Sequence, residues 1–281
     1  MILFKKSGDL RQFLQQIPGK GMQVGWVPTM GALHPGHLSL LETARKENAL
    51  SICSIFVNPT QFNVASDFEK YPITLEKDIK LLVAAKVDLL FLPDVDDIYP
   101  KGISGLEQYP LGYLETTLEG EFRPGHFQGV CQVMNRLLEI IAPGRLYMGQ
   151  KDYQQCMVIQ KLLELKQSGT ILHTCSTRRE PDGLAMSSRN MRLSESERKD
   201  AIGLYEALTY IQQHLHPGDL TALVGHAKSI LLQRNFRIDY VEMADAVTLH
   251  PVKRWDSKEK LVALAAAFQG QVRLIDNMLL T

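Results

Sequence analysis

Two histidines in the segment Pro28–His37, with the sequence PTMGALHPGH, have the types and spacing best suited to chemistry. The segment follows an apolar run and leads into an amphipathic one, so it should connect a strand to a helix. Pro35 and Gly36 suit a first helical turn, where main-chain N–H groups lack a partner within the helix. These donors and the helix dipole favour an anion, most obviously a nucleotide phosphate. His34 and His37 lie three positions apart, so both imidazoles should reach the same phosphates.

Two other interpretations of this pair need weighing. Histidines beside a turn are often surface residues, and an HxxH pair can be half of a metal site. The sequence shows no third and fourth ligand at a convincing spacing nearby, which disfavours a metal. Open α/β sheets bind their ligands where strands end and helices begin. Position and spacing together therefore favour nucleotide binding.

The elements that would position these histidines alternate regularly along the first 177 residues. We expect strands over 23–28, 51–57, 88–93 and 170–177, and helices over 36–48, 74–86, 127–141 and 152–166. This alternation is typical of βαβ units in a doubly wound parallel sheet. We therefore assign residues 1–177 to a Rossmann-like domain with its ligands near the carboxyl ends of the strands.

The pattern changes over residues 176–194, a polar segment with a proline, a glycine and no apolar period. Ser194 and Glu197 form a capping-box pattern that should begin one helix, and Asp219 could cap a second. We expect helices over 195–214 and 220–234, then strands over 237–244, 261–268 and 272–279. Two helices followed by strands predict a smaller α+β domain with an antiparallel sheet over residues 178–281.

Composition argues against several classes of protein. The 31 basic residues balance 31 acidic ones, so the chain has no net field to attract a nucleic acid. No apolar run reaches the roughly 18 residues of a membrane span, and the first ten residues lack a signal-peptide pattern. Four scattered cysteines form no CxxC pair, as expected in a reducing compartment. We therefore expect a cytoplasmic protein that binds neither nucleic acid nor membrane.

Several strings in the sequence carry a resemblance to known proteins. HPGH (34–37) resembles the HIGH signature of the nucleotidyltransferase superfamily. Within that superfamily, PTMGALHPGHLSLL (28–41) and IFVNPTQF (55–62) resemble the pantothenate synthetase family. Further agreement comes from DFEKYP (67–72), RPGHFQGV (123–130), GQKDYQQ (149–155) and DGLAMSSRN (182–190). The strings occur in order along the first domain and into its junction with the second.

This resemblance implies an ATP-dependent, AMP-forming acid–amine ligase with a two-step reaction. The carboxylate of pantoate attacks the α-phosphate of ATP, releases pyrophosphate and leaves an enzyme-bound pantoyl-adenylate. The amine of β-alanine then attacks the activated carbonyl and gives pantothenate and AMP. A carboxylate needs no base to attack phosphorus, so the first step requires mainly positioning and charge stabilisation. The resemblance also implies Mg²⁺, which normally accompanies the triphosphate, and a homodimer.

The same resemblance assigns roles to individual residues. His34, His37 and Lys151 are the implied catalytic residues, with His37 a proton donor, a role that a nearby phosphate anion would favour. Gln61 and Gln155 are implied to bind pantoate, with Gln61 also near β-alanine, because amides contact an anion without repelling it. The implied ATP contacts are Met30, Gly31, His34, His37, Gly149, Gln150, Lys151, Asp152, Arg178, Met186, Ser187, Ser188 and Arg189.

Several of these residues have plainer alternatives. A lysine such as Lys151 is usually a solvated surface residue, and Gln61 and Gln155 could be exposed polar residues. Pro28, Met30 and Phe62 could enclose the gem-dimethyl group of pantoate, although such apolar side chains are more often core. Asp78 is the family-matched ligand for Mg²⁺, although an aspartate on an amphipathic helix is usually only solvated.

Other features leave more than one possibility open. Gln150 replaces the glutamate usual in the family, and Arg178 replaces an apolar residue, although main-chain contacts would survive both changes. Residues 185–189 stand where the superfamily has a mobile KMSKS-type loop. They could be a simple linker, a hinge that brings donors onto the triphosphate as a lid domain closes, or both.

Two other functions compete with the ligase. A nucleotidyltransferase would leave AMP attached to a stable product, but the second domain and the FVNPTQF string weigh against it. A non-catalytic nucleotide sensor would be expected to lose phosphate-contacting residues, yet His34, His37 and Lys151 are all present, as are Ser188 and Arg189. A tRNA synthetase is disfavoured by the neutral charge and by the lack of an anticodon-sized domain.

Overall fold

The computed structural model describes residues 1–17, 23–62, 68–69 and 71–280. It divides into two compact units, Met1–Gly149 with Gln154–Ser176, and Gln150–Tyr153 with Thr177–Thr281. The string DFEKYP includes Asp67 and Lys70, which lie outside the described residues. Within the described ranges, no helix combines the length and the apolar character needed to span a bilayer.

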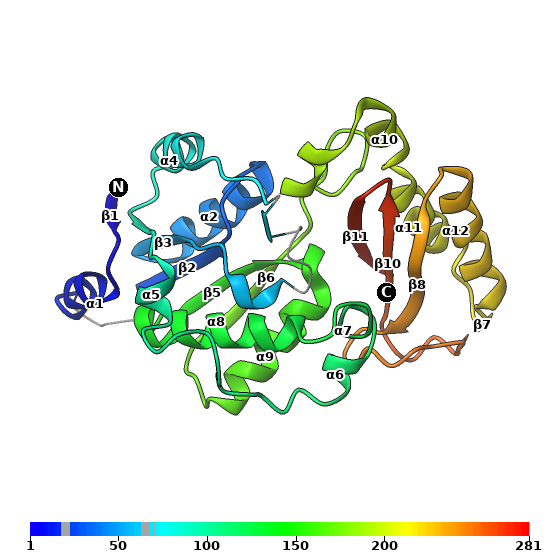
Figure 1. Ribbon diagram of the computed structural model, residues 1–281. Helices are drawn as coiled ribbons and strands as arrows, with labels where there is room; N and C mark the ends of the chain where they lie inside the picture. The colour runs from blue at the N-terminus through cyan, green and yellow to red at the C-terminus, as the bar shows by residue number, and fades with distance from the viewer. Residues whose placement is uncertain (18–22, 63–67, 70, 281) are drawn as a thin grey trace. The chain divides into compact units, whose positions relative to one another are not determined.

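The first unit contains a six-stranded parallel sheet with the strand order β1-β4-β3-β2-β5-β6 (Figure 1). The strands are β1 (Ile2–Phe4), β2 (Val24–Thr29), β3 (Leu50–Ile55), β4 (Leu89–Phe91), β5 (Arg145–Gly149) and β6 (Ile171–Cys175). The central strands β3 and β4 are almost continuously buried because helices cover both of their faces. The predicted Rossmann-like parallel sheet is therefore confirmed.

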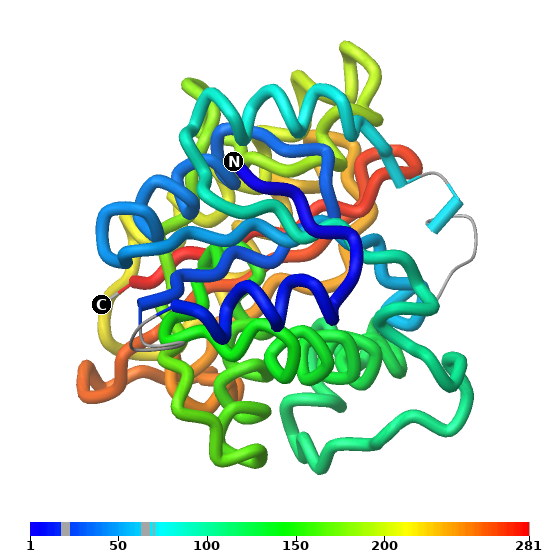
Figure 2. The backbone as a smooth tube through the Cα atoms, turned by 90° about the vertical axis from the view of Figure 1, so that its left-hand side faces the viewer, coloured from blue at the N-terminus to red at the C-terminus, as the bar shows by residue number. Residues whose placement is uncertain are grey.

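Helices pack on both faces of this sheet. They are α1 (Ser7–Gln15), α2 (Pro35–Glu47), α4 (Leu75–Ala84), α5 (Val95–Ile98), α6 (Tyr113–Thr116), α7 (Glu119–Phe122), α8 (His126–Ile141) and α9 (Tyr153–Leu165), with 3-10 helices η2 (Pro59–Gln61) and η3 (Gln150–Asp152). One core cluster joins strand side chains such as Trp26 to α1, α8 and α9, and another joins Val27 to α2 and α4. Figure 2 shows α4, in cyan, on the opposite side of the sheet from α1 and α8.

The strand order reverses at β2, since β3 and β4 follow it on one side and β5 and β6 lie on the other. Parallel pairing of Gly25 with Arg145 and of Trp26 with Leu146 joins β2 to β5 at this point. Open α/β sheets bind ligands outside the carboxyl ends of the strands at such a switch point. The HPGH segment follows β2, so the topology agrees with the anion site predicted there.

The second unit holds a three-stranded antiparallel sheet, β11-β10-β8, and a two-stranded pair, β7-β9. Its elements are η4 (Ser188–Arg192), α10 (Glu195–Asp200), α11 (Gly203–His214), β7 (Gly218–Asp219), α12 (Thr221–Gln233), β8 (Arg237–Asp245), β9 (Arg254–Trp255), β10 (Leu261–Gln269) and β11 (Val272–Leu279). The predicted α+β arrangement is confirmed. The capping box is also confirmed, because Ser194 N donates to Glu197 Oε2 at 2.8 Å.

Two sequence predictions about this unit need correction. The single helix expected over 195–214 is two helices, and α11 starts at Gly203, which packs against Arg234 and Phe236. That tertiary contact leaves no trace in the apolar period. The segment Gln150–Tyr153 groups with the second unit, although the sequence placed it inside the first domain. The reason is tertiary, because Asn277 on β11 donates hydrogen bonds to the main-chain carbonyls of Gln150 and Lys151.

Candidate nucleotide and substrate site

The segment after β2 turns sharply before α2 begins. Gly31 and Ala32 have φ of 81° and 50°, in the left-handed region that glycine adopts more readily than alanine. His34 is then the N-cap residue in extended conformation, and Pro35 occupies the first helical position. The predicted strand-to-helix turn is therefore present, and it ends at a helix N-terminus of the kind that can bind an anion.

His34 and His37 lie side by side at the start of α2, with ring centroids 4.0 Å apart. The main-chain N–H of His34 points at Nδ1 of His37, at 3.4 Å. Because a main-chain N–H can only donate, Nδ1 acts as the acceptor and a neutral His37 carries its proton on Nε2. His37 can thus donate a hydrogen bond from Nε2 whether it is neutral or charged.

Asp78 holds the turn in front of these histidines. It lies on α4 and is 1% exposed, so the solvated alternative for this residue is wrong. Its two carboxylate oxygens accept the main-chain N–H groups of Ala32 at 2.9 Å and Leu33 at 2.8 Å, and Thr74 Oγ1 adds a third bond at 3.0 Å. These bonds stabilise the left-handed backbone at Ala32.

The predicted magnesium role of Asp78 gains no support from this geometry. Its carboxylate already accepts three hydrogen bonds within the protein. Over the described ranges, no group of three or more His, Cys, Asp or Glu side chains could hold a metal ion. The described residues therefore do not form a cage for Mg²⁺, and ligation by Asp78 stays a prediction.

Gln61 and Met30 come together beyond the ends of β3 and β2. Gln61 Nε2 contacts Met30 Sδ at 2.9 Å, and Asn58 Nδ2 donates to Gln61 Oε1 at 3.3 Å. Asn58 is 1% exposed and is itself fixed by Tyr99 Oη, which donates to its Oδ1 at 2.9 Å. The neighbouring Phe62 packs its ring 5.3 Å from that of Phe68. The amide of Gln61 is therefore oriented, with its nitrogen directed toward Met30.

Residues of the string RPGHFQGV (123–130) hold the main chain of Gln61 in place. Arg123 donates to His126 Nε2 at 3.0 Å, so the other nitrogen, Nδ1, carries the proton and donates to Gln61 O at 2.8 Å. Gly129 on α8 approaches η2 so closely that an added Cβ would lie 2.2 Å from Thr60 O. These contacts give the string a structural role that the residue types alone do not predict.

The two glutamines at the start of α9 have different surroundings. Gln154 is buried, accepts Glu119 N at 3.0 Å and donates to Leu114 O and Thr117 O. Gln155, the predicted pantoate contact, is half-buried. Gly149 ends β5, and no atom of the described residues lies within 4 Å of an added Cβ there.

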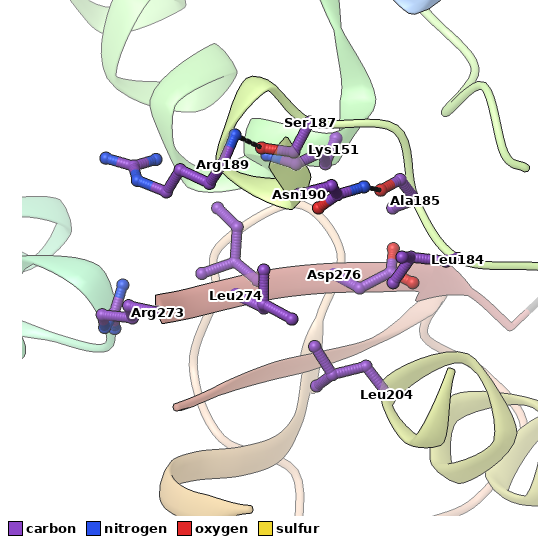
Figure 3. A pocket seen from close by; sticks show the side chains of 11 residues that line it. Lys151, Leu184, Ala185, Ser187, Arg189, Asn190, Leu204, Arg273, Leu274 and Asp276 are labelled. Atoms are coloured by element: carbon purple, nitrogen blue, oxygen red, sulfur yellow. Dashed lines mark hydrogen bonds between the residues drawn. The ribbon is translucent and has the colours of Figure 1, made fainter. Parts of the chain in front are cut away.

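In the second unit, Lys151, Ser187 and Arg189 line one pocket (Figure 3). The side chain of Lys151 is 16% exposed and its Nζ donates to Asp152 Oδ1 at 3.3 Å, so it is not a solvated surface lysine. Ser187 Oγ accepts the main-chain N–H of Arg189 at 3.3 Å at the start of η4. The structure therefore brings three predicted ATP contacts together, and Ser188 beside them is 9% exposed.

Residues 178–186 form a short hairpin. Met186 N donates to Arg178 O at 3.0 Å, which joins two predicted ATP contacts directly through the main chain, while the side chain of Arg178 is exposed. An isolated bridge joins Arg179 to Ala185, and Gly183 at the turn has φ of 96°. Ala185 and Met186, which begin the segment 185–189 considered above as a possible linker, are therefore hydrogen-bonded parts of this hairpin.

Comparison with known proteins shows which family this chain belongs to. A model of a family described as pantoate-beta-alanine ligase matches residues 2–279. The chain belongs to this family. Pantothenate synthetases of Thermosipho africanus and Thermotoga neapolitana are 40% and 42% identical, each over 283 residues that cover the whole of both chains.

Solved pantoate-β-alanine ligase structures have the same fold. The pantothenate synthetase of Thermus thermophilus superposes with a TM-score of 0.90 at 40% identity and covers 99% of both chains. The enzyme of Francisella tularensis, solved in complex with beta-gamma ATP and β-alanine, gives 0.83 at 36% identity and covers 99% of this chain and 97% of its own. The expectation of an ATP-dependent ligase of this family is confirmed.

Proposed function

We propose that this chain condenses pantoate with β-alanine through a pantoyl-adenylate, with ATP converted to AMP and pyrophosphate. The family match over residues 2–279 is the observation that supports this reaction most directly. A strand-to-helix turn bearing His34 and His37 beside a sheet switch point supports the nucleotide chemistry. The beta-gamma ATP and β-alanine bound to the Francisella enzyme agree with two of the proposed substrates.

In the first step, a carboxylate oxygen of pantoate forms a bond to the α-phosphorus while the bond to the β-phosphate breaks. In our proposal, the N-terminus of α2 and Nε2 of His37 donate to the developing negative charge. Lys151, Ser187 and Arg189 supply further donors and positive charge from the pocket of the second unit. We propose that Mg²⁺ enters with ATP.

In the second step, the amine of β-alanine bonds to the acyl carbon, AMP departs and the nitrogen loses a proton. The oriented amide of Gln61 is the group we assign to pantoate and β-alanine, together with Gln155 for pantoate. Each amide offers donors and an acceptor, so it binds a hydroxyl or carboxylate without charge repulsion. We further propose that the enzyme is a cytoplasmic homodimer.

The test is incubation of the purified chain with ATP, Mg²⁺, pantoate and β-alanine, followed by separation of the products. We expect equal amounts of AMP and pantothenate, and pantoate-dependent exchange of labelled pyrophosphate into ATP. A stable adenylated product would instead assign the chain to nucleotidyl transfer. Absence of AMP in the presence of all substrates would exclude the ligase.

A further inference from the structure

Two consecutive polar residues, Asp276 and Asn277, lie between the apolar residues Ile275 and Met278 of strand β11. Each is 3% exposed. Burial of a carboxylate and an amide costs free energy unless both are hydrogen-bonded, so each needs partners within the protein. Since β11 is an edge strand of its sheet, those partners come from segments outside the sheet.

Asp276 binds the hairpin that leads to Ser187–Arg189. Arg179 donates to both of its carboxylate oxygens, Nη1 to Oδ2 at 2.5 Å and Nη2 to Oδ1 at 3.0 Å. The same guanidinium donates to Gly183 O at 3.1 Å and to Asn277 O at 3.3 Å. Burial raises the pKa of the Asp276 carboxyl, and the Arg179 guanidinium opposes that rise. Because the guanidinium is planar and bonds both carboxylate oxygens, this pair fixes the orientation of the Arg179 side chain as well as its distance from Asp276.

Asn277 binds the other segment, η3. Its Nδ2 donates to Gln150 O at 2.9 Å and to Lys151 O at 2.8 Å, and its Oδ1 accepts Gln150 Nε2 at 3.2 Å. The Asn277 amide therefore binds the two main-chain carbonyl groups that flank the Cα atom of Lys151. Both donor hydrogens and the acceptor of Asn277 are used in this way.

We propose that Asp276 and Asn277 are positioning residues, which bind the two ATP-contacting segments of the second unit to one strand. Lys151, Ser187, Arg189 and Asp276 line the same pocket, so a shift of either segment changes the donors presented there (Figure 3). The inference rests on the proposed function, because it takes these segments to contact ATP. A purely structural role would predict a loss of stability with no preference between substrates.

The decisive variant is Asn277→Asp, which keeps the shape of the side chain but replaces both N–H donors by an acceptor facing two carbonyls. We expect the KM for ATP in pyrophosphate exchange to rise roughly tenfold or more, and the KM for pantoate to change much less. Val272→Ala is the matched control, because Val272 is buried in the core of the same strand at its other end. It should lower the midpoint of thermal unfolding and leave both KM values unchanged.

If Asn277→Asp fails to fold by circular dichroism, Arg179→Lys provides the measurement, because lysine keeps the charge beside Asp276 but cannot bond both oxygens as a fork. It should raise the KM for ATP in the same selective way. If the variant that folds changes the KM for ATP no more than Val272→Ala does, the positioning role is refuted. An inactive wild-type chain would instead refute the proposed ligase reaction, so the two failures are distinguishable.

Discussion

The carboxylate of Asp78 accepts the main-chain N–H of Ala32 at 2.9 Å, although the two residues are 46 positions apart in the chain. The second carboxylate oxygen accepts the N–H of Leu33. This pair of bonds joins α4 to the turn that precedes His34, so a residue first considered as a metal ligand holds the backbone of the proposed phosphate site.

Asp78→Asn distinguishes these two roles. The new amide nitrogen would face a main-chain N–H, so we expect the free energy of unfolding to fall by about 2–3 kcal/mol. Denaturant unfolding without ATP or Mg²⁺ measures this loss, which a role limited to metal binding would not produce. The KM for ATP should rise and stay high as Mg²⁺ is increased; recovery at high Mg²⁺ would favour metal ligation.

His37→Ala and Lys151→Ala test the proposed charge stabilisation in the first step. Each removes one donor to the reacting phosphates, so we expect pyrophosphate exchange to slow by roughly 10²–10³-fold. The circular dichroism spectrum should be unchanged because neither side chain belongs to a core cluster. A variant that loses activity only because it unfolds would contradict the assignment of that residue.

For the adjacent residues Gln154 and Gln155, we expect replacement by alanine to have different effects on stability and on substrate binding. Gln155→Ala should raise the KM for pantoate more than the KM for ATP, with little effect on stability. Gln154→Ala removes three hydrogen bonds to residues 114–119 and should destabilise the fold by about 1–3 kcal/mol. If Gln155→Ala raises the KM for ATP more than the KM for pantoate, Gln155 would be assigned to nucleotide binding instead.

Gly129→Ala tests the close approach of α8 to η2. The added methyl group would lie 2.2 Å from Thr60 O, so η2 must shift, and we expect a loss of about 1–3 kcal/mol in stability. The KM for pantoate should rise as well, because Gln61 ends η2. Gly8→Ala on α1 is the control: in the described part of the chain, no atom lies within 4 Å of its added Cβ, and it should stabilise the protein by about 0.5–1 kcal/mol. Equal stability of the two variants would contradict the packing argument.

The buried thiols give a prediction on pH. Burial raises the pKa of Cys53 and of Cys131 to about 12. The reactive thiolate should therefore be scarce near neutral pH and increase only as the pH approaches that value. We expect iodoacetamide at about pH 8 to leave both residues unmodified in the native protein and to modify both in urea. Mass spectrometry of the digested protein checks this, and native labelling of either residue would show that it is accessible.

Local patterns in the sequence predicted the elements that depend on local residues. Helical spacing, the Pro35–Gly36 turn and the Ser194–Glu197 capping box act over a few positions, so they are visible in the sequence. The short elements between β4 and α8 have no such period and were not predicted. Individual strand and helix ends differ by one to a few residues, since fraying and turn geometry determine them.

The partners of buried polar residues could not be predicted in the same way. Asp78 meets Ala32, and Asn277 meets Lys151, only after folding joins distant parts of the chain. An aspartate on an amphipathic helix looks the same in the sequence whether it is solvated or buried. The sequence does hold one signal of this kind: the polar pair Asp276–Asn277 stands between the apolar residues Ile275 and Met278 of β11, which indicates partners beyond the sheet.

The segments attached to β11 also affect how the sheet meets other molecules. On one edge strand, β11, the side chain of Arg179 donates a hydrogen bond to the Asn277 carbonyl. On the other edge strand, β8, residues around Pro251 pair with Ala244 and Met243. Exposed edge strands can recruit a strand from another chain and so begin aggregation. Loops bound at both edges, one carrying a proline with no N–H to donate, make that recruitment harder. The contacts proposed to position ATP donors would thus also protect the newly folded protein from aggregation through edge-to-edge strand pairing.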